Sequence, residues 1–358
     1  MKIVIDILTP KQCMLFQKLS ERLERKGYEV YRFTRRYREV NQLLDKKGID
    51  ATIIGEHGGK ELKDKLVASA ERILRLAPIF GEIDPDVSLS FASPELARVS
   101  YGLGVPHLCI SDSPHAVAVS KLTIPLSSRL FTPTAIPKEA WTKYGISAED
   151  ITQYNSLDPW AWLHDFKPDE SILDELGLDV TKPVITVRVP ESFAAYLWNR
   201  NSKESSIIWF MNNLKRIRSD LQIVALPRYE EQIKKLRDAS VEDIVICDYV
   251  VDGASLLYYT DVFVGAGGTM SAEAVLLGVP TFSSYPGDPY LIEQYLVRRG
   301  LVVRETNYNN LLNKILSLLD DLDPKKKNQV KKVRELVRDF EDPIDVIVNG
   351  FEVFDIER

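Results

Sequence analysis

The stretch that decides the fold reads Asp261-Val-Phe-Val-Gly-Ala-Gly-Gly-Thr-Met-Ser-Ala-Glu-Ala-Val-Leu-Leu-Gly-Val-Pro280. Within it, Val262 to Val264 form a short apolar run of the kind that makes a parallel strand buried on both faces. The run leads into Gly265, Gly267 and Gly268, and then directly into a helical sequence. Glycines let the backbone turn tightly and let a ligand approach the main chain. The stretch therefore predicts a buried strand, a glycine turn and a helix.

The first turn of this helix is a candidate anion site. Backbone amides at a helix N-terminus point outward and carry partial positive charge, so they bind phosphate or another anion. Thr269 can cap the helix or donate its hydroxyl to the same anion. Glu273, one turn deeper, would repel a diphosphate but can accept two hydrogen bonds from a vicinal diol such as a ribose. The alternative is a plain strand-to-helix turn whose glutamate is favoured by the helix dipole.

Strands and helices alternate along the chain on the N-terminal side of this stretch as well. Ile3 to Ile5 and Ala51 to Ile54 are further strand-like runs, and Leu15, Leu19 and Leu23 recur every four residues as in an amphipathic helix. Such alternation is typical of βαβ units and a mostly parallel sheet. Ligands of these sheets bind beyond the carboxyl ends of the strands, so we expect functional residues there.

The alternation breaks between about Asp150 and Thr181 and restarts at Val184. At about 100–200 residues per domain, a chain of 358 residues has room for two domains. We therefore predict an N-terminal Rossmann-like domain over residues 1–165 and a C-terminal Rossmann-like domain over residues 166–340.

Composition and charge narrow the class of protein further. Lysine and arginine number 46 against 52 aspartates and glutamates, a net charge of −6, which is unfavourable for neutralising the phosphates of a nucleic acid. The three cysteines, Cys13, Cys109 and Cys247, are far apart in sequence, which argues against a disulfide framework and fits a reducing compartment. No leader and no apolar run near the ~20 residues of a membrane span are evident. We expect a cytoplasmic protein.

Several segments resemble known families. Gly265 to Ala274, followed by Leu277 to Pro280, is similar to the nucleotide-sugar loop of GT-B-fold proteins, including non-hydrolysing UDP-N-acetylglucosamine 2-epimerases and MurG-type glycosyltransferases. The whole chain resembles more closely the uncharacterised family called domain of unknown function 354, found mainly in archaea. The segments that carry this resemblance are Ile5 to Pro10, Ser111 to Pro114, Leu256 to Asp261 and Gly267 to Met270.

The resemblance implies an α/β protein of GT-B type, with two Rossmann-like doubly wound parallel-sheet domains that face a central cleft. A nucleotide-diphosphate sugar is the implied substrate, a UDP-sugar is favoured, and no further cofactor is required. The resemblance also implies that the C-terminal domain binds the nucleotide and that the N-terminal domain holds the acceptor or sugar. The last helix of such folds commonly crosses back to the N-terminal domain, and residues 341–358 contain the candidate. The epimerases' paired histidine and arginine are not obvious here, where Val187 to Glu191 stand instead. The residues implied to hold the diphosphate and ribose are Gly267, Gly268, Thr269, Met270 and Glu273.

Two further segments at the carboxyl ends of predicted strands carry candidate chemistry. Arg188 ends the strand that opens the second series and can clamp a diphosphate, or else lie at the surface and pair with Glu191. After the predicted strand His107 to Ile110, Asp112 or His115 can act as general base on an acceptor hydroxyl. The alternative for this second segment is ordinary turn chemistry before a proline.

Four more residues are weaker candidates for contact with substrate, because each is polar and lies near the end of a predicted strand. They are Thr9, Lys11, His57 and Ser111. Arg32, Arg35, Arg36 and Arg38 crowd another such turn and suit an anionic acceptor or a membrane headgroup. The four histidines have no metal-ligand spacing, so we predict no metal site.

Taken together, these patterns predict a glycosyltransferase-like enzyme that acts on a nucleotide-diphosphate sugar in the interdomain cleft. A nucleotide-sugar epimerase of the same fold is the near alternative, and a non-catalytic nucleotide-sugar binding or regulatory protein is the alternative of another class. The expected partners are the nucleotide sugar and an acceptor whose identity the sequence does not give. Nucleic acid is not expected as a partner. A homodimer and peripheral contact with a membrane are both compatible with the sequence.

Overall fold

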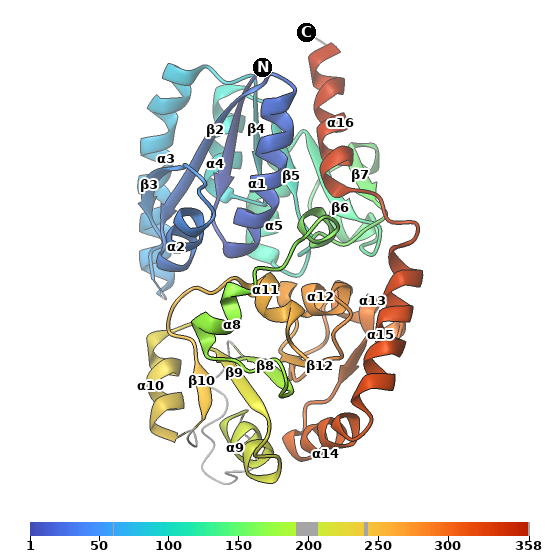
Figure 1. The fold of residues 1–358 in the computed structure, drawn as a ribbon. Coiled ribbons are helices and arrows are strands. Elements are labelled where there is room, and N and C mark those ends of the chain that lie inside the picture. The colour runs from blue at the N-terminus through green and yellow to red at the C-terminus, as the bar shows by residue number, and fades with distance from the viewer. Residues whose placement is uncertain (60, 191–206, 240–242, 357–358) are drawn as a thin grey trace. The chain divides into compact units, whose positions relative to one another are not determined.

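The computed structural model describes residues 1–59, 61–190, 207–239 and 243–356, and its fold is drawn in Figure 1. Every strand pair among these residues is parallel. The strands are β1 Lys2–Ile7, β2 Glu29–Arg36, β3 Thr52–Glu56, β4 Val87–Ser90, β5 His107–Ile110, β6 Arg129–Pro133, β7 Ile151–Tyr154, β8 Val184–Arg188, β9 Gln222–Leu226, β10 Ile244–Ile246, β11 Val262–Gly265, β12 Thr281–Ser283 and β13 Val302–Arg304.

Helices connect most of these strands, and two single turns of 3-10 helix occur at Ile124–Leu126 and Ala148–Asp150. The α-helices are α1 Pro10–Arg25, α2 Arg38–Lys46, α3 Leu62–Ile83, α4 Pro94–Leu103, α5 Val117–Thr123, α6 Glu139–Thr142, α7 Trp160–Leu163, α8 Ser171–Leu176, α9 Ile207–Ile217, α10 Glu230–Ala239, α11 Gly253–Tyr258, α12 Thr269–Leu276, α13 Leu291–Arg298, α14 Tyr308–Leu319, α15 Leu322–Val337 and α16 Pro343–Ile356.

The chain forms two compact units. Unit 1 comprises Met1–Trp162 together with Phe340–Arg358, and unit 2 comprises Leu163–Asp339. Unit 1 contains a seven-stranded sheet in the order β3-β2-β1-β4-β5-β6-β7, and unit 2 a six-stranded sheet in the order β10-β9-β8-β11-β12-β13. The predicted α/β class with two doubly wound parallel sheets is confirmed.

The strand order of unit 1 reverses at β1, because β2 and β3 lie on one side of it and β4 to β7 on the other. Since βαβ crossovers are right-handed, α1 and α2 cover one face of the sheet and α3, α4 and α5 cover the other (Figure 1). The central strands are buried on both faces, as the apolar run Ile3 to Ile5 predicts. Residues that follow β1 and β4 therefore flank the crevice where such sheets bind ligands.

Unit 2 follows the same plan, with its reversal between β8 and β11. Its core packs α9 and α14 against β8, β9 and β11, through side chains such as Phe210, Leu214 and Ile315 that are fully buried. The glycine turn comes directly after β11, at the carboxyl edge of the sheet. The fold of unit 2 therefore places the glycine turn at its topological switch point, beside the end of β8.

Helix α16, the last of the chain, belongs to unit 1 (Figure 1). It packs against α1, and Arg22 Nη1 of α1 donates to Asp345 Oδ1 at 2.7 Å. Ile347 and Phe351 of α16 are fully buried, and Gly350 lies so close to the Phe131 ring that an added Cβ would clash. The chain therefore returns from unit 2 to complete the core of unit 1.

Two strands carry weak signals in the sequence. They are β7, which falls in the stretch where the predicted alternation breaks, and β13. Both are edge strands of their sheets. β7 carries Thr152 and Gln153 at its centre, and β13 has only three residues, so neither has the continuous apolar run that identifies a buried strand.

Candidate functional site

The glycine turn of unit 2 has a backbone that only glycine adopts readily. Gly267 has φ of +76°, and Gly268 has φ of +85° with ψ of −172°. Gly268 is exposed and occupies the N-cap of α12, and no side chain caps this helix. Thr269 is the first helical residue rather than the cap that the sequence suggested. The first turn of α12 itself contains no acidic side chain, so the helix contributes no carboxylate that would oppose an anion at its amides.

Three buried polar atoms beside this turn have no hydrogen-bond partner in the part of the chain that the structure describes. They are Oγ of Ser271 and both carboxylate oxygens of Glu293. Glu293 lies in the first turn of α13 and is only 5 % exposed. Its Oε2 would be 3.0 Å from a Cβ added to Gly267, so the carboxylate lies against the turn. Buried polar atoms without partners are rare in proteins and call for an explanation such as a bound ligand.

The sequence analysis did not single out Glu293. It is 26 positions beyond Gly267, and only the packing of α13 against the glycine turn brings the two together. The available signal was its position, since it follows the turn sequence Pro286-Gly-Asp-Pro289 and the end of the neighbouring strand β12. Residues that follow adjacent parallel strands meet at one edge of a sheet.

The two other residues predicted on α12 are placed differently from each other. Glu273 is buried one turn into the helix. The Met270 side chain packs with Leu257 and Phe263 in an apolar cluster of unit 2, so only its backbone belongs to the glycine turn. Gly267 and Gly268 therefore form the turn between β11 and α12, and Thr269 begins the helix.

Arg188 lies at the end of β8, but its guanidinium bonds to its own sheet. Nη1 donates to the carbonyl oxygens of Leu226 and Pro227 at 3.3 and 3.2 Å. These carbonyls end β9, on the side of β8 away from β11 and its glycine turn. Glu191, the alternative partner named for this arginine, lies outside the described residues. The prediction that Arg188 clamps a diphosphate is untested.

In unit 1, three charged side chains meet at the carboxyl edge of the sheet. Lys11 Nζ lies 2.5 Å from Oδ2 of Asp112, to which it donates a hydrogen bond, and 2.5 Å from Oδ2 of Asp158. Tyr154 donates its hydroxyl to the other oxygen of Asp158, and Ser113 donates to Oδ1 of Asp112 at 2.7 Å. We call Lys11, Asp112 and Asp158 the lysine–aspartate cluster.

The two carboxylates of the lysine–aspartate cluster differ in proton affinity. Burial raises the pKa of Asp158 to about 6, and the negative charge of Asp112 adds to this against the opposing effect of Lys11. Burial acts on Asp112 in the same direction, but the Lys11 ammonium overrides it and keeps the pKa of Asp112 below its usual value. The Asp112 side chain is 19 % exposed and that of Asp158 only 2 %. Asp112 is therefore the more acidic of the two carboxyl groups and the one that faces solvent.

Asp158 was not predicted, whereas Lys11 and Asp112 were. Burial works against the charge of Lys11, but Asp112 and Asp158 together raise its pKa, so the lysine stays protonated. It is held inside the cluster rather than extended toward solvent. Asp158 follows β7, a strand the sequence did not reveal, and this is why its proximity to Lys11 was not foreseen.

The remaining predicted residues of unit 1 are scattered around this edge. His115 is partly exposed, and partial burial lowers its pKa against the effect of Asp112, so its ring is neutral near pH 7 and can accept a proton. Ser111 is buried, and its Oγ accepts from the Ser113 amide at 3.3 Å. Thr9 is the N-cap of α1 without a side-chain cap bond. His57 stacks on Tyr37 with ring centroids 4.4 Å apart.

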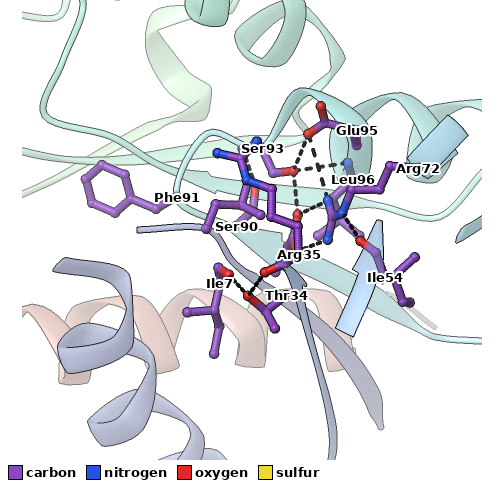
Figure 2. Close-up of polar contacts among 12 residues, drawn as sticks. Ile7, Thr34, Arg35, Ile54, Arg72, Ser90, Phe91, Ser93, Glu95 and Leu96 are labelled. Atoms are coloured by element: carbon purple, nitrogen blue, oxygen red, sulfur yellow. Dashed lines mark hydrogen bonds and ion pairs between the residues drawn. The ribbon is translucent and has the colours of Figure 1, made fainter. Parts of the chain in front are cut away.

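Unit 1 contains a second buried polar network, which is drawn in Figure 2. Arg72 of α3 donates from Nη1 and Nη2 to the two carboxylate oxygens of Asp6 at 2.7 and 2.5 Å, and from Nε to the Ile54 carbonyl at 2.8 Å. Ser93 Oγ donates to Asp6 at 2.6 Å while it accepts the amide of Leu96 as the cap of α4. Every group named here has a partner, so the network holds α3 and α4 to the sheet.

Phe91, the first residue after β4, lies beside Lys11. Lys11 Nζ is 4.2 Å from the centroid of its ring, and its carbonyl accepts from Gln12 Nε2 at 3.2 Å. The next residue, Ala92, has φ of +51°, a left-handed conformation that alanine rarely adopts. Strained backbone of this kind is concentrated at functional sites. The turn after β4 thus presents an aromatic face to Lys11 at the switch point of unit 1.

The predicted basic cluster of β2 does not form a single patch. Arg32 and Arg36 each pair with a glutamate of a neighbouring element, at 2.5 and 3.1 Å. Burial lowers the pKa of Arg35, which lies on the opposite side of the strand near Glu95 and Asp6. Because side chains alternate between the faces of a strand, consecutive arginines point to different surroundings. An anionic acceptor bound by these residues together is therefore not supported.

Comparison with known proteins identifies the family of this chain. Residues 1–355 match the family described as "Protein of unknown function (DUF354)". The chain belongs to this family. Within known proteins it is 30% identical over 314 residues to the uncharacterised protein MJ0665 of Methanocaldococcus jannaschii, a match that covers 86% of this chain and 89% of that protein. The resemblance stated from the sequence is confirmed.

The fold of this chain is similar to that of several solved structures. A UDP-GlcNAc 2-epimerase of Neisseria meningitidis bound to UDP-GlcNAc superposes with a TM-score of 0.74, at 15% identity over 98% of this chain and 99% of that chain. The spinosyn rhamnosyltransferase SpnG superposes with a TM-score of 0.63, at 12% identity over 98% of this chain and 99% of that chain. At these identities the comparison establishes the fold alone, and the expected GT-B-like architecture is confirmed.

Two observations concern membranes and metals. Among the described residues, no helix is long and apolar enough to cross a bilayer. Over the same part of the chain, no three or more histidine, cysteine, aspartate or glutamate side chains are grouped so as to hold a metal ion.

Proposed function

We propose that this DUF354 protein is a glycosyltransferase-like enzyme whose substrate is a nucleotide-diphosphate sugar bound at the glycine turn of unit 2. The observation that carries the proposal is the turn itself, an open helix N-terminus with three unpartnered buried polar atoms on Ser271 and Glu293. The amides from Gly268 onward suit the diphosphate, because a helix N-terminus favours an anion. The family's structural neighbours include an epimerase that binds UDP-GlcNAc, which favours a UDP-sugar.

The two glutamates near the turn suit the hydroxyl groups of such a ligand. A carboxylate is an acceptor only, so the unpartnered oxygens of Glu293 require donors. In a nucleotide sugar, the ribose lies on one side of the diphosphate and the sugar on the other, and both carry hydroxyl groups that can donate. Inorganic phosphate carries no such sugar hydroxyl groups. We propose that the Glu273 carboxylate accepts hydrogen bonds from the ribose hydroxyls.

The lysine–aspartate cluster of unit 1 is proposed to supply the proton chemistry. In glycosyl transfer, an acceptor oxygen forms a bond to the anomeric carbon while the bond from that carbon to the diphosphate oxygen breaks. The acceptor proton passes to Asp112 or to the neutral ring of His115, and the nucleoside diphosphate leaves with the bonding electron pair. Lys11 keeps Asp112 ionised and ready to accept that proton.

A nucleotide-sugar epimerase is the second candidate, and one observation favours it. Two carboxylates whose proton affinities are driven apart, Asp112 and Asp158, share one lysine. Such pairs are typical of sites where one group removes a proton and another returns it. In an epimerase, a proton leaves a sugar carbon and a proton is added to its opposite face, with no net change in composition.

Binding is tested by thermal unfolding in the presence of UDP-, GDP-, CDP- and dTDP-sugars. A ligand that binds only the folded chain raises the midpoint by mass action. We expect a UDP-sugar to raise the midpoint of the wild type and to raise that of Glu273→Ala much less. Absence of a shift with every nucleotide sugar would overturn the proposal.

Turnover separates the two reactions. Incubation in deuterium oxide incorporates deuterium into the sugar if the protein is an epimerase, whereas transfer releases free UDP and leaves the sugar carbons unlabelled. In both cases Lys11→Met is expected to lower turnover at least a hundredfold while the UDP-sugar still shifts the unfolding midpoint. Binding without either product would identify a nucleotide-sugar binding protein instead.

A further inference from the structure

Arg35, near the carboxyl end of β2, is a cation with an unused hydrogen-bond donor. The residue is partly buried, and its buried Nε has no hydrogen-bond partner in the part of the chain that the structure describes. Burial lowers the pKa of Arg35 against the effect of Glu95 and Asp6, but a guanidinium stays protonated in proteins. A buried donor without a partner is costly, so a ligand that accepts a hydrogen bond from it is favoured.

The carboxylates closest to Arg35 in charge are held by other groups. Asp6 accepts from both Nη atoms of Arg72 and from Ser93, and Oε2 of Glu95 lies 3.8 Å from Nη1 of Arg72. Two arginines therefore stand against two carboxylates in this network, part of which Figure 2 shows. Because these four charges sum to zero, the network has no net negative charge that would repel an anion from Arg35.

The backbone opposite Arg35 departs from a regular ladder. β3 has one more residue than β2 in this stretch, and the extra residue falls between Ile53 and Glu56. Gly55, in the same segment, has φ of +79°. An extra residue of this kind is a β-bulge, and bulges are frequent next to active sites, where they redirect side chains or end strand pairing.

Two stacked rings lie beside Arg35. Tyr37 follows β2 and His57 follows β3, and their ring centroids are 4.4 Å apart with 17° between the planes. Partial burial and the positive charges of Arg35 and Lys65 lower the pKa of His57, so its ring is neutral near pH 7. The turn after β3 is fixed against α3, because a Cβ added to Gly58 would lie 2.8 Å from the Lys65 Cα.

A guanidinium binds carboxylate and phosphate groups with parallel hydrogen bonds from its planar fork. The carboxyl edge of a parallel sheet, where Arg35 lies, is also where such sheets bind ligands. We propose that Arg35 binds an oxyanion group, a carboxylate or a phosphate, on the acceptor molecule, with the rings of Tyr37 and His57 beside that group. Calling this ligand the acceptor rests on the proposed function, whereas binding of the anion by unit 1 does not. Arg32 and Arg36, which pair with glutamates, take no part.

Calorimetric titration of the full chain with glucuronate, glucose 6-phosphate and neutral glucose tests the proposal. The wild type is expected to bind one or both anions and not glucose, and the anion that binds identifies the oxyanion as carboxylate or phosphate. Arg35→Lys keeps the charge but loses the planar fork, so it should bind about tenfold more weakly. Its unfolding midpoint should match that of the wild type, because a cation still faces Glu95. Arg36→Lys, which changes the exposed neighbouring arginine, is the matched control and should bind as the wild type does.

Nitrogen-15 labelling of arginine locates the bound anion. The Nε–H signal of Arg35, assigned by its disappearance in Arg35→Lys, should shift when the anion is added, and that of Arg36 should not. No binding of either anion by the wild type overturns the proposal, as does equal binding of glucose. Equal affinity of the wild type and Arg35→Lys would identify an adventitious ion only and overturns it too. Titration with UDP-N-acetylglucosamine tests the glycine turn of unit 2 separately, so either result can fail without the other.

Discussion

At the residue scale, the most informative feature is one lysine held between two aspartates at the edge of the unit 1 sheet. Lys11 lies 2.5 Å from both Asp112 and Asp158, and the three groups share a net charge of −1 when fully ionised. A buried charge that loses its partner is costly, because desolvation is then uncompensated. The cluster is therefore expected to dominate both the pH dependence and the mutational sensitivity of unit 1.

Asp158→Asn is expected to change how stability depends on pH. The folded-state pKa of Asp158 is raised to about 6, above its unfolded value, so the protonated carboxyl favours folding. That contribution is complete below about pH 4 and is lost as pH rises through 6. The unfolding free energy of the wild type should therefore fall relative to Asp158→Asn across this window, by roughly 3 kcal/mol. Urea unfolding of both proteins at several pH values checks this, and parallel curves would contradict it.

Ala92→Gly is expected to stabilise the protein. Alanine at φ of +51° is strained, and glycine adopts this conformation without a Cβ clash. The gain should be on the order of 1 kcal/mol in unfolding free energy. Denaturant titration measures it, with Ala97→Gly as control, because Ala97 lies inside α4 and should lose about that amount. A loss at both positions would mean that the left-handed turn does not persist in solution.

The sequence identified some of these residues because each signal was local. Lys11 follows β1 and Asp112 follows β5 within a few positions. Recognising these strands in the sequence was therefore enough to predict that both residues lie at the carboxyl edge of the sheet. Asp158 and Glu293 gave no such signal, since their neighbours are fixed by tertiary packing across many residues. Arg188 shows the opposite case, where the position was foreseen and the hydrogen-bond partners were not.

At the element scale, helices are held to the sheets by a few buried polar contacts as well as by apolar packing. Arg72 ties α3 to β1 through Asp6 and to β3 through the Ile54 carbonyl (Figure 2). Both charged side chains are essentially unexposed. The central strands and long helices were predictable from apolar runs and four-residue spacing, whereas these polar anchors were not.

Arg72→Met is expected to destabilise unit 1 by about 3–5 kcal/mol, because it leaves Asp6 charged and buried without its main partner. The double variant Asp6→Asn/Arg72→Met removes both charges and should recover more than half of that loss. Denaturant unfolding of the two variants and the wild type measures the difference. A double variant as unstable as the single would show that the cost lies in packing rather than in the unpaired charge.

At the scale of the whole molecule, the chain builds two parallel-sheet units and returns to the first with α16. The alternation of strands and helices made two such units predictable, because each βαβ step has a recognisable period. The membership of α16 in unit 1 was implied only by the family resemblance. The apolar residues of α16 do not by themselves indicate which of the two sheets the helix covers.

A chain that ends at Asp339 is expected to lose a stable unit 1. The truncation exposes the sites of Ile344, Ile347, Val348 and Phe351, each of which is at most 2 % exposed in the full chain. Burial of one such side chain contributes about 1.5–3 kcal/mol, so together they approach the stability of a typical domain. Scanning calorimetry should show the transition of unit 1 lost or strongly lowered and that of unit 2 retained. An unchanged thermogram would contradict the assignment of α16.

The central claim is that the glycine turn of unit 2 binds the diphosphate of a nucleotide sugar, and calorimetric titration with UDP-N-acetylglucosamine tests it most directly. Gly268→Ala forces the exposed N-cap of α12 out of its φ of +85°, although an added Cβ there meets nothing within 4 Å. Gly300→Ala, at φ of +63° elsewhere in unit 2, is the matched control. We predict binding by the wild type and Gly300→Ala and at least tenfold weaker binding by Gly268→Ala. Equal binding by all three proteins, or no binding by the wild type, would contradict the claim.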